Sequence, residues 1–235
     1  MKKSLLALSA ISLAACNQGE INQQTHKHST QQTETSSEKE TTTSDGSTTT
    51  PSDHKKHQKE VKDGITYIDN ILIVNKDIAL PESYAPGEIQ EARQAIDQLI
   101  QQGNTQGLNL VLRSGFRSYA TQTELYNNYV ARDGQSKADT YSARPGHSEH
   151  QTGLAFDLGN TAGIDDFKVS FENTAEGKWI KENAQDYGFI IRYPKGKADI
   201  TGYQYEPWHL RYLGKDTAQK VKSSGLTLEE YLGLK

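Results

Sequence analysis

Residues 148–157 read Ser-Glu-His-Gln-Thr-Gly-Leu-Ala-Phe-Asp, and residues 206–211 read Glu-Pro-Trp-His-Leu-Arg. Together they supply a histidine, a carboxylate, a second histidine and a spare carboxylate, which are the residue types of a zinc site with three ligands and a general base. Three protein ligands leave a fourth position for water, and imidazole with carboxylate suits zinc better than calcium or magnesium. The two stretches therefore predict a zinc hydrolase.

The first stretch is not a regular helix, although His150 and Asp157 are seven residues apart and a helix would place both on one face. Gly153 and the apolar β-type residues that follow it argue against a helix. We therefore expect His150 on a loop and Asp157 on the strand after it, with the chain folding back to bring them together.

The second stretch is expected to bend at 206–208. Glu206 and His209 are three residues apart, so a regular strand would point them to opposite faces. Pro207 excludes a helix interior. A bend or bulge therefore allows both side chains to reach one site.

Residues 1–16 have the features of a lipoprotein signal peptide. Two lysines precede a short apolar run, and small residues lead to Cys16, the only cysteine of the chain. This ending resembles the bacterial lipobox, so we expect lipid attachment at Cys16 and an extracytoplasmic protein anchored to the bacterial cell membrane. An ordinary cleaved signal peptide is the alternative.

The next segment, 17–60, is rich in Thr, Ser, Gln, Glu and Lys and almost free of aliphatic residues, which predicts a disordered polar linker. Its histidines are interpreted as solvated linker residues; they are His26, His28, His54 and His57. Residues 61–235 have the size of one domain. The chain has 26 Lys and Arg against 30 Asp and Glu, so no basic surplus indicates nucleic acid. We expect a monomer.

Hydrophobic periodicity in 61–235 indicates interleaved strands and helices. The expected strands are 65–68 and 71–74 around a turn, 108–112, 154–158 and 189–193. The expected helices run from Pro86-Gly87 to a stop at Gly103, from a cap at Ser118 to about Arg132, over 175–187, and in the tail from Lys215. The irregular order favours an α+β fold with a small, mostly antiparallel sheet flanked by helices and a zinc site in a cleft on the sheet.

The two site stretches, together with 182–194 (Glu-Asn-Ala-Gln-Asp-Tyr-Gly-Phe-Ile-Ile-Arg-Tyr-Pro) and 200–214 (Ile-Thr-Gly-Tyr-Gln-Tyr-Glu-Pro-Trp-His-Leu-Arg-Tyr-Leu-Gly), resemble the VanY family of zinc carboxypeptidases. The run Ser-Gly-Phe-Arg-Ser at 114–118, followed by Gln122, also matches. The resemblance covers about 108–214. It is strongest to bacterial envelope L,D- and D,D-carboxypeptidases that trim peptidoglycan stem peptides.

The resemblance implies that His150, Asp157 and His209 bind Zn²⁺ and that Glu206 is the general base. Arg117 then stabilises the oxyanion or holds a substrate carboxylate, because its planar fork is fixed and always charged. His147 is the rival ligand to His150, and Pro145-Gly146 just ahead of it make a regular helix there unfavourable. We favour His150.

The family pattern also implies that Gln122 and Ser148 hydrogen-bond the terminal carboxylate of the substrate. Arg211 is a candidate for orienting Asp157 or Glu206, or for a purely structural role. Other candidates near the site are Arg144, Trp208, which we interpret as a core residue, and the tyrosines Tyr193, Tyr203 and Tyr205.

The expected function is a zinc-dependent L,D-carboxypeptidase that removes the terminal D-alanine from peptidoglycan tetrapeptide stems. A D,D-carboxypeptidase acting on pentapeptide stems is the alternative, since the metal chemistry is common to both. A non-catalytic zinc-binding envelope lipoprotein is the alternative from another class. Glu206 separates the classes, because a purely structural zinc site needs no carboxylate beside an open metal position.

Overall fold

The computed structural model describes residues 56–235. The predicted signal peptide 1–16, its Cys16 and most of the linker 17–60 lie outside the described residues. Within the described range, no helix has the length and apolar character needed to cross a bilayer.

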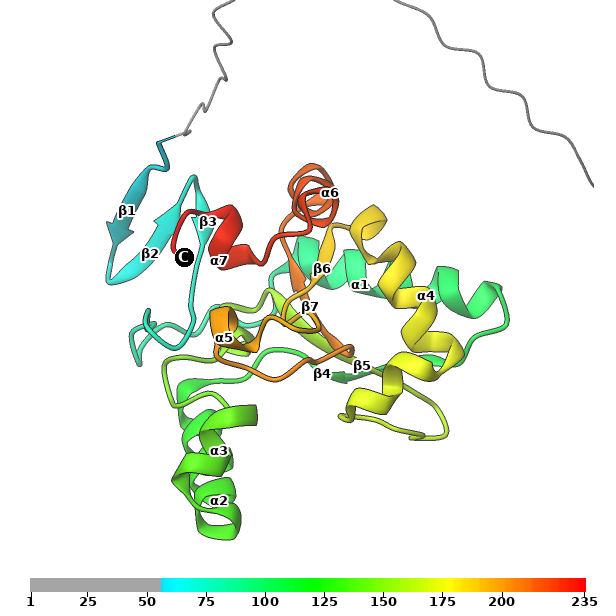
Figure 1. Cartoon of the computed structure of the whole chain (residues 1–235), viewed down its shortest axis with the longest axis horizontal. Coiled ribbons are helices and arrows are strands. Elements are labelled where there is room, and N and C mark those ends of the chain that lie inside the picture. Colours follow the sequence, from blue (N-terminus) through cyan, green and yellow to red (C-terminus); the bar gives the residue numbers. More distant parts are fainter. Residues whose placement is uncertain (1–55) are drawn as a thin grey trace, which may run out of the picture. The chain divides into compact units, whose positions relative to one another are not determined.

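A four-stranded antiparallel sheet lies at the centre of the fold (Figure 1). Its strands are β4 (Leu110–Ser114), β5 (Ala155–Asn160), β6 (Phe189–Ile191) and β7 (His209–Tyr212). Their order is β4-β5-β7-β6, and every neighbouring pair is antiparallel. This confirms the predicted α+β fold with a small antiparallel sheet.

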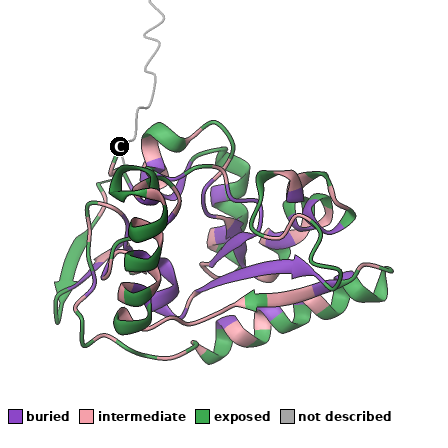
Figure 2. Ribbon diagram, turned by 90° about the horizontal axis from the view of Figure 1, so that it is seen from below, coloured by how far each residue is buried: buried purple, intermediate pink, exposed green. Residues whose placement is uncertain are grey.

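Helices cover the sheet and close the main core. They are α1 (Gln90–Thr105), α4 (Ala175–Asn183) and the 3-10 turn η3 (Ala184–Tyr187). Ile96, Leu99, Phe156, Ile180 and Phe189 are fully buried between these helices and the sheet. All six residues of β5 are buried, and Figure 2 shows the central strands as buried ribbon against helices with exposed outer faces. The strand that carries Asp157 therefore lies in the packed interior of the domain.

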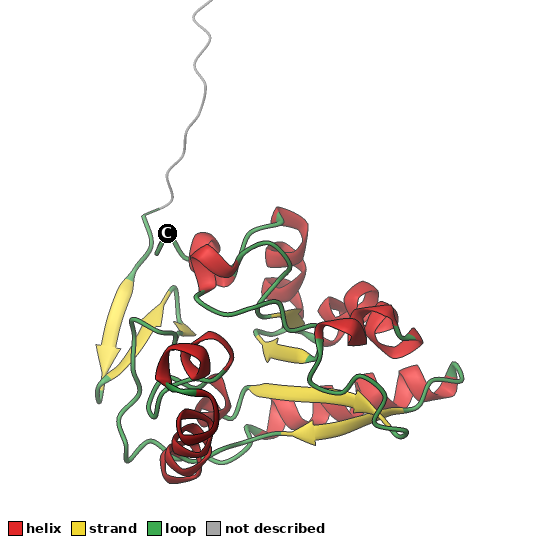
Figure 3. Ribbon diagram, turned by 60° about the horizontal axis from the view of Figure 1, so that its bottom comes forward, coloured by secondary structure: helices red, strands yellow, loops and turns green. Residues whose placement is uncertain are grey.

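Two helices between β4 and β5 form a separate hairpin (Figure 3). They are α2 (Tyr119–Asp133) and α3 (Gln135–Tyr141). Ser118 caps α2 as predicted, because its Oγ accepts a hydrogen bond from the backbone N–H of Thr121. Asp139 fixes the hairpin by accepting hydrogen bonds from Tyr126 at 2.7 Å and from Arg144 at 2.7 Å.

A second, three-stranded antiparallel sheet precedes the central one. Its strands are β1 (Lys59–Lys62), β2 (Ile65–Ile68) and β3 (Ile71–Leu72). The predicted turn between β2 and β3 is present, with Asp69 and Asn70 both at positive φ. The linker prediction is wrong at its end, because β1 begins at Lys59 and His57 contacts Asp69 at 2.9 Å. This edge strand has three charged residues and one valine, all exposed, so no apolar face marks it in the sequence.

The C-terminal helices pack against this second sheet. They are α6 (Lys215–Ser224) and α7 (Leu228–Tyr231). Ile68 and Ile73 share a buried cluster with Val221, Leu228 and Leu232. The first and last segments of the described chain thus form one substructure, and the C-terminal end lies near β3 in Figure 1.

Three predicted helix limits need correction. Gly103 does not stop α1, which continues to Thr105; Gly103 is buried where α1 packs on Leu110. The helix begins at Gln90 rather than at Pro86-Gly87. The predicted helix 175–187 divides into α4 and η3. The remaining elements are the 3-10 turns η1 (Glu149–Thr152) and η2 (Val169–Asn173) and the short helix α5 (Ala198–Thr201).

Candidate metal centre and active site

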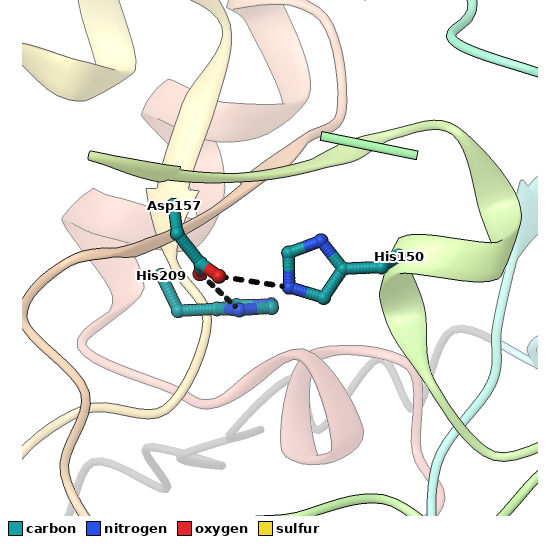
Figure 4. A group of neighbouring side chains, drawn as sticks. All are labelled: His150, Asp157 and His209. Carbon is teal, nitrogen blue, oxygen red and sulfur yellow. Dashed lines mark hydrogen bonds and ion pairs between the residues drawn. The ribbon is translucent and has the colours of Figure 1, made fainter. Parts of the chain in front are cut away.

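Three elements bring the predicted metal ligands together. In the β5–β7 pair, Asp157 lies directly opposite His209. His150 belongs to η1, which ends at Gly153 in the left-handed conformation with φ 70°. This residue reverses the chain into β5, so His150 points back at the Asp157 carboxylate (Figure 4). His150 is thus on a turn and Asp157 on the next strand, as the sequence predicts.

The three side chains form a compact, buried donor set. His150 Nε2 lies 3.1 Å from Asp157 Oδ2, and His209 Nδ1 lies 3.0 Å from Asp157 Oδ1. One ligand atom from each residue lies within 4.8 Å of the other two. Ligands about 2.1 Å from a tetrahedral zinc ion are separated by about 3.4 Å, so small adjustments accommodate the ion.

The histidine tautomers also suit a metal. His150 Nδ1 contacts the Gly115 carbonyl oxygen at 2.8 Å, so it carries the proton and leaves Nε2 as a lone pair that faces Asp157. His209 Nε2 lies 3.5 Å from a carboxylate oxygen of Glu149, while its Nδ1 faces Asp157. The two imidazoles and one carboxylate match the ligand chemistry of zinc.

The electrostatics of the metal-free site hold a proton on His209. Burial lowers the pKa of His209, but the nearby carboxylates of Asp157 and Glu149 outweigh burial and raise it to about 9. Burial also acts to raise the pKa of Asp157, yet the two histidines hold that pKa well below its usual range. Burial lowers the pKa of His150. The donor set is therefore one anion, one cation and one neutral imidazole before metal arrives.

Glu206 lies beside this donor set, at the predicted bend. The backbone N–H of His209 donates to the Glu206 carbonyl oxygen at 3.2 Å, which closes a turn through Pro207 and Trp208. Glu206 Oε2 consequently lies 3.9 Å from His209 Nδ1. Burial raises the pKa of the Glu206 carboxyl to about 8, against the opposing effect of His209. Such a carboxylate can take and return protons near neutral pH.

Arg117 faces the same site, and Gln122 holds it there. Arg117 Nη1 donates to Gln122 Oε1 at 2.8 Å, and Nη2 donates to Ser114 Oγ at 3.1 Å. Gln122 in turn donates to the Ala143 carbonyl at 2.6 Å and is fully buried. Both ends of the Gln122 amide thus have protein partners beside Arg117. Its contact with the substrate carboxylate stays a prediction.

A cavity of about 590 Å³ opens over the donor set. Its walls include the three candidate ligands, Glu206, Arg117 and Ser148, as well as Tyr193, Tyr203 and Trp208. Trp208 is also part of the main core, as predicted. The far wall comes from the α2–α3 hairpin and includes Leu125, Tyr129, Arg132, Lys137 and Tyr141.

The other candidates lie away from the donor set. His147 contacts the backbone carbonyl of Asn75 at 2.8 Å, which supports His150 as the ligand. Arg144 is exposed and paired with Asp139. Tyr205 lines a different cavity. Arg211 does not contact Asp157 or Glu206; its Nη1 donates to Glu149 Oε1 at 2.8 Å.

Sequence reasoning missed Glu149, although it directly precedes His150. It is 1% exposed, and its neighbours Arg192 and Arg211 are fully buried. The residues around Glu149 in the sequence do not indicate its role, because its partners lie far along the chain. Only the sheet register brings them together.

The comparisons with known proteins agree with this site. The model of the VanY family, described as D-alanyl-D-alanine carboxypeptidase, matches residues 88–215. A putative carboxypeptidase, YodJ of Bacillus subtilis, is 41% identical over 192 residues, covering 72% of this chain and 70% of the relative. A D-alanyl-D-alanine carboxypeptidase of Enterococcus faecium is 33% identical over 177 residues, covering 75% of this chain and 49% of the relative.

Solved structures of carboxypeptidases are also similar to this chain. The L,D-carboxypeptidase DacB from Streptococcus pneumoniae is 44% identical, with a TM-score of 0.70 over 77% of this chain and 97% of that one. A Zn(II) complex of the D,D-pentapeptidase VanY from a VanB-type resistance cassette is 32% identical, with a TM-score of 0.59 over 68% of this chain and 97% of that one. The chain therefore belongs to the VanY family of D-alanyl-D-alanine carboxypeptidases.

Proposed function

We propose that this chain is a zinc-dependent L,D-carboxypeptidase that removes the terminal D-alanine from peptidoglycan tetrapeptide stems. The observation that carries the proposal is the buried set His150, Asp157 and His209 with Glu206 at its side and Arg117 facing the same cavity. A structural zinc site would have no use for the last two residues.

The chemistry follows from what each side chain can do. A zinc ion held by the two histidines and Asp157 supplies a Lewis acid and lowers the pKa of water. Glu206 takes a proton from the attacking water and delivers it to the amine that leaves with D-alanine. Its raised pKa suits this shuttle, because a carboxyl that titrates near neutral pH both accepts and releases the proton.

Arg117 supplies the fixed positive charge of the cavity. Its two hydrogen bonds, with Gln122 and Ser114, hold the guanidinium in place before substrate binds. The group then binds the developing oxyanion or the terminal carboxylate without reorganising. Ser148 lines the same cavity and is the second candidate for the carboxylate. Gln122 positions Arg117 through its amide oxygen and stays a candidate for binding the same carboxylate.

The preference for L,D-cleavage is supported by the degree of likeness. The L,D-carboxypeptidase structures LdcB and DacB are 44% identical with TM-scores of 0.69 and 0.70, against 32% and 0.59 for the D,D-pentapeptidase VanY. The two reactions share the metal chemistry and differ in the residue that precedes the scissile bond. The preference therefore depends on how the cavity walls receive that residue.

The test measures D-alanine release from purified tetrapeptide and pentapeptide stems by the zinc-loaded protein, with Glu206→Gln as the control. We expect release from the tetrapeptide that is lost with Glu206→Gln. Release from the pentapeptide alone would retain the mechanism and change the specificity to D,D. No release from either peptide by a protein that binds zinc would instead support a binding function.

We further propose that the domain is a monomer that works outside the cytoplasm, attached to the membrane by lipid at Cys16. The short apolar run before Cys16 supports this proposal, and so does a substrate that lies just outside the membrane. Incorporation of labelled fatty acid into the full chain, and its loss in Cys16→Ala, is the measurement that decides it.

A further inference from the structure

Four charged side chains form a buried network behind the metal centre. Arg192 Nε donates to Glu149 Oε1 at 2.7 Å, and its Nη1 donates to Glu229 Oε2 at 2.8 Å. Arg211 Nη1 donates to the same Glu149 Oε1 at 2.8 Å. The four side chains are at most 1% exposed, and their charges cancel. Burying four charges is costly, so the network needs a reason beyond stability.

One carboxylate oxygen of this network has no hydrogen-bond partner within the described residues. Both arginines use Glu149 Oε1, while Oε2 is buried and makes no hydrogen bond within the described part of the chain. The Nε2 atom of His209 is buried and lacks a hydrogen bond in the same way. These two atoms face each other at 3.5 Å. Buried polar atoms are seldom left without a partner, so their approach points to a paired function.

We propose that Glu149 is a positioning residue for the metal centre, an inference that rests on the proposed zinc enzyme. Its Oε2 accepts the Nε2–H of His209, which keeps the Nδ1 lone pair of that imidazole directed at the metal. The two arginines hold the carboxylate in place and supply the charge that keeps it ionised. His150 has the same arrangement with a backbone carbonyl, that of Gly115, in place of a carboxylate.

The network also connects the metal centre to the C-terminal helix α7. Glu229 lies on α7 and binds the guanidinium of Arg192, which reaches Glu149. Glu229 neutralises the charge of Arg192 and does not contact His209. It therefore provides a matched control, because Glu149→Gln and Glu229→Gln each remove one buried negative charge from the same network.

The chemistry of Glu149→Gln is predictable. Two arginines donate to the position of Oε1, so the amide oxygen of glutamine takes that position. The amide NH₂ then faces the N–H of His209, donor against donor. This arrangement favours the His209 tautomer that carries its proton on Nδ1. The protonated Nδ1 has no lone pair with which to bind the metal.

The first experiment measures the zinc Kd of metal-free protein by competition with a chromogenic chelator. We expect Glu149→Gln to weaken zinc binding by about 10- to 100-fold. Glu229→Gln should stay within about threefold of wild type, and thermal melts of both variants report the shared loss of network stability. Equal zinc affinity in wild type and a folded Glu149→Gln would overturn the inference while leaving the proposed zinc enzyme intact. A wild type that binds no zinc would overturn the proposed function itself.

The second experiment uses zinc-loaded wild type alone, so it does not depend on the variant folding. Nitrogen-15 NMR of the histidine rings should show His209 with its proton on Nε2, protected from exchange with water by Glu149. A zinc-loaded His209 whose proton is on Nδ1, or whose Nε2–H exchanges as fast as that of an exposed imidazole, would contradict the proposal.

Discussion

Asp157 is the residue on which the metal centre depends, because each of its two oxygens faces a different histidine. The distances are 3.1 Å to His150 Nε2 and 3.0 Å to His209 Nδ1. Without metal, a proton on His209 takes part in this contact, and the pKa of His209 is raised to about 9. A metal ion that binds between the same atoms must displace that proton.

Zinc affinity should therefore rise with pH. Because the folded pKa of His209 is raised from 6.5 to about 9, its bound proton stabilises the metal-free fold below pH 6.5, and this contribution is lost as pH rises through 9. Zinc competes with one proton in that interval. We expect the zinc association constant to increase by about tenfold per pH unit between pH 6.5 and 8.5. An affinity that does not change with pH, measured by chelator competition, would argue against this protonation state.

Glu206→Gln should separate catalysis from binding. The substitution keeps the shape of the side chain and removes its base, so kcat should fall by at least about 100-fold. The zinc content should stay near one ion per chain, because Glu206 is not one of the three ligands. Metal-free stability should not fall, since burial already favours the neutral form of this carboxyl. Steady-state kinetics, metal analysis and a thermal melt of the metal-free protein test these three outcomes. Unchanged turnover would remove Glu206 from the mechanism.

At the scale of elements, the turn from η1 into β5 depends on Gly153. This residue has φ 70°, and a Cβ there would lie 2.0 Å from the backbone oxygen of Gly87. Gly153→Ala should therefore lower the free energy of unfolding by more than the roughly 1 kcal/mol that a left-handed alanine costs. Gly107→Ala is the control, because Gly107 has φ 88° with open space around it.

Chemical denaturation of the two glycine variants gives the comparison. The difference between them reports the close approach of the two chain segments, which we expect to add about 1–3 kcal/mol. Gly153→Ala should also weaken zinc binding, because His150 lies on the displaced turn. Two variants with equal losses of stability would show that the backbone contact at Gly87 does not matter.

Helix caps and turns were predicted correctly where the neighbouring residues alone determine them. Ser118 caps α2 through its own hydroxyl, and Asp69-Asn70 form a turn because both tolerate positive φ. The prediction that Gly103 stops the helix is wrong because the role of this glycine is tertiary. A Cβ there would lie 2.5 Å from Leu110 Cδ1, so glycine allows α1 to pack closely on β4.

The candidate site was predicted to the extent that its residues form contiguous motifs. His150, Asp157, Glu206 and His209 come from two short stretches, and the structure brings all four together. The charged network was not predictable. Glu149 meets its partners only through the sheet register and the packing of α7, which no single segment encodes.

At the scale of the whole molecule, the metal centre lies where separate parts of the chain meet. The main core holds the central sheet, and the second core joins β2 and the segment after β3 to α6 and α7. Arg211 connects them, since it donates to Glu149 beside the site and to the Leu72 carbonyl in β3. Metal binding should therefore stabilise the whole domain and not only the site.

Removing zinc should accordingly lower the melting temperature of the full domain in a single transition. At a free zinc concentration of about 100 times Kd, binding adds roughly 2.7 kcal/mol to the free energy of unfolding. For a domain of this size that corresponds to about 5–10 °C. Calorimetry with and without a chelator measures the shift. Two separate transitions, with only one of them sensitive to zinc, would show that the two cores unfold independently.

The most direct test of the account is zinc titration of the metal-free enzyme while D-alanine release from a tetrapeptide stem is followed. The account predicts that activity rises linearly and stops at one zinc ion per chain. It also predicts that Glu206→Gln takes up the same ion and stays inactive. Full activity without metal, or a Glu206→Gln variant that regains activity with zinc, would contradict it.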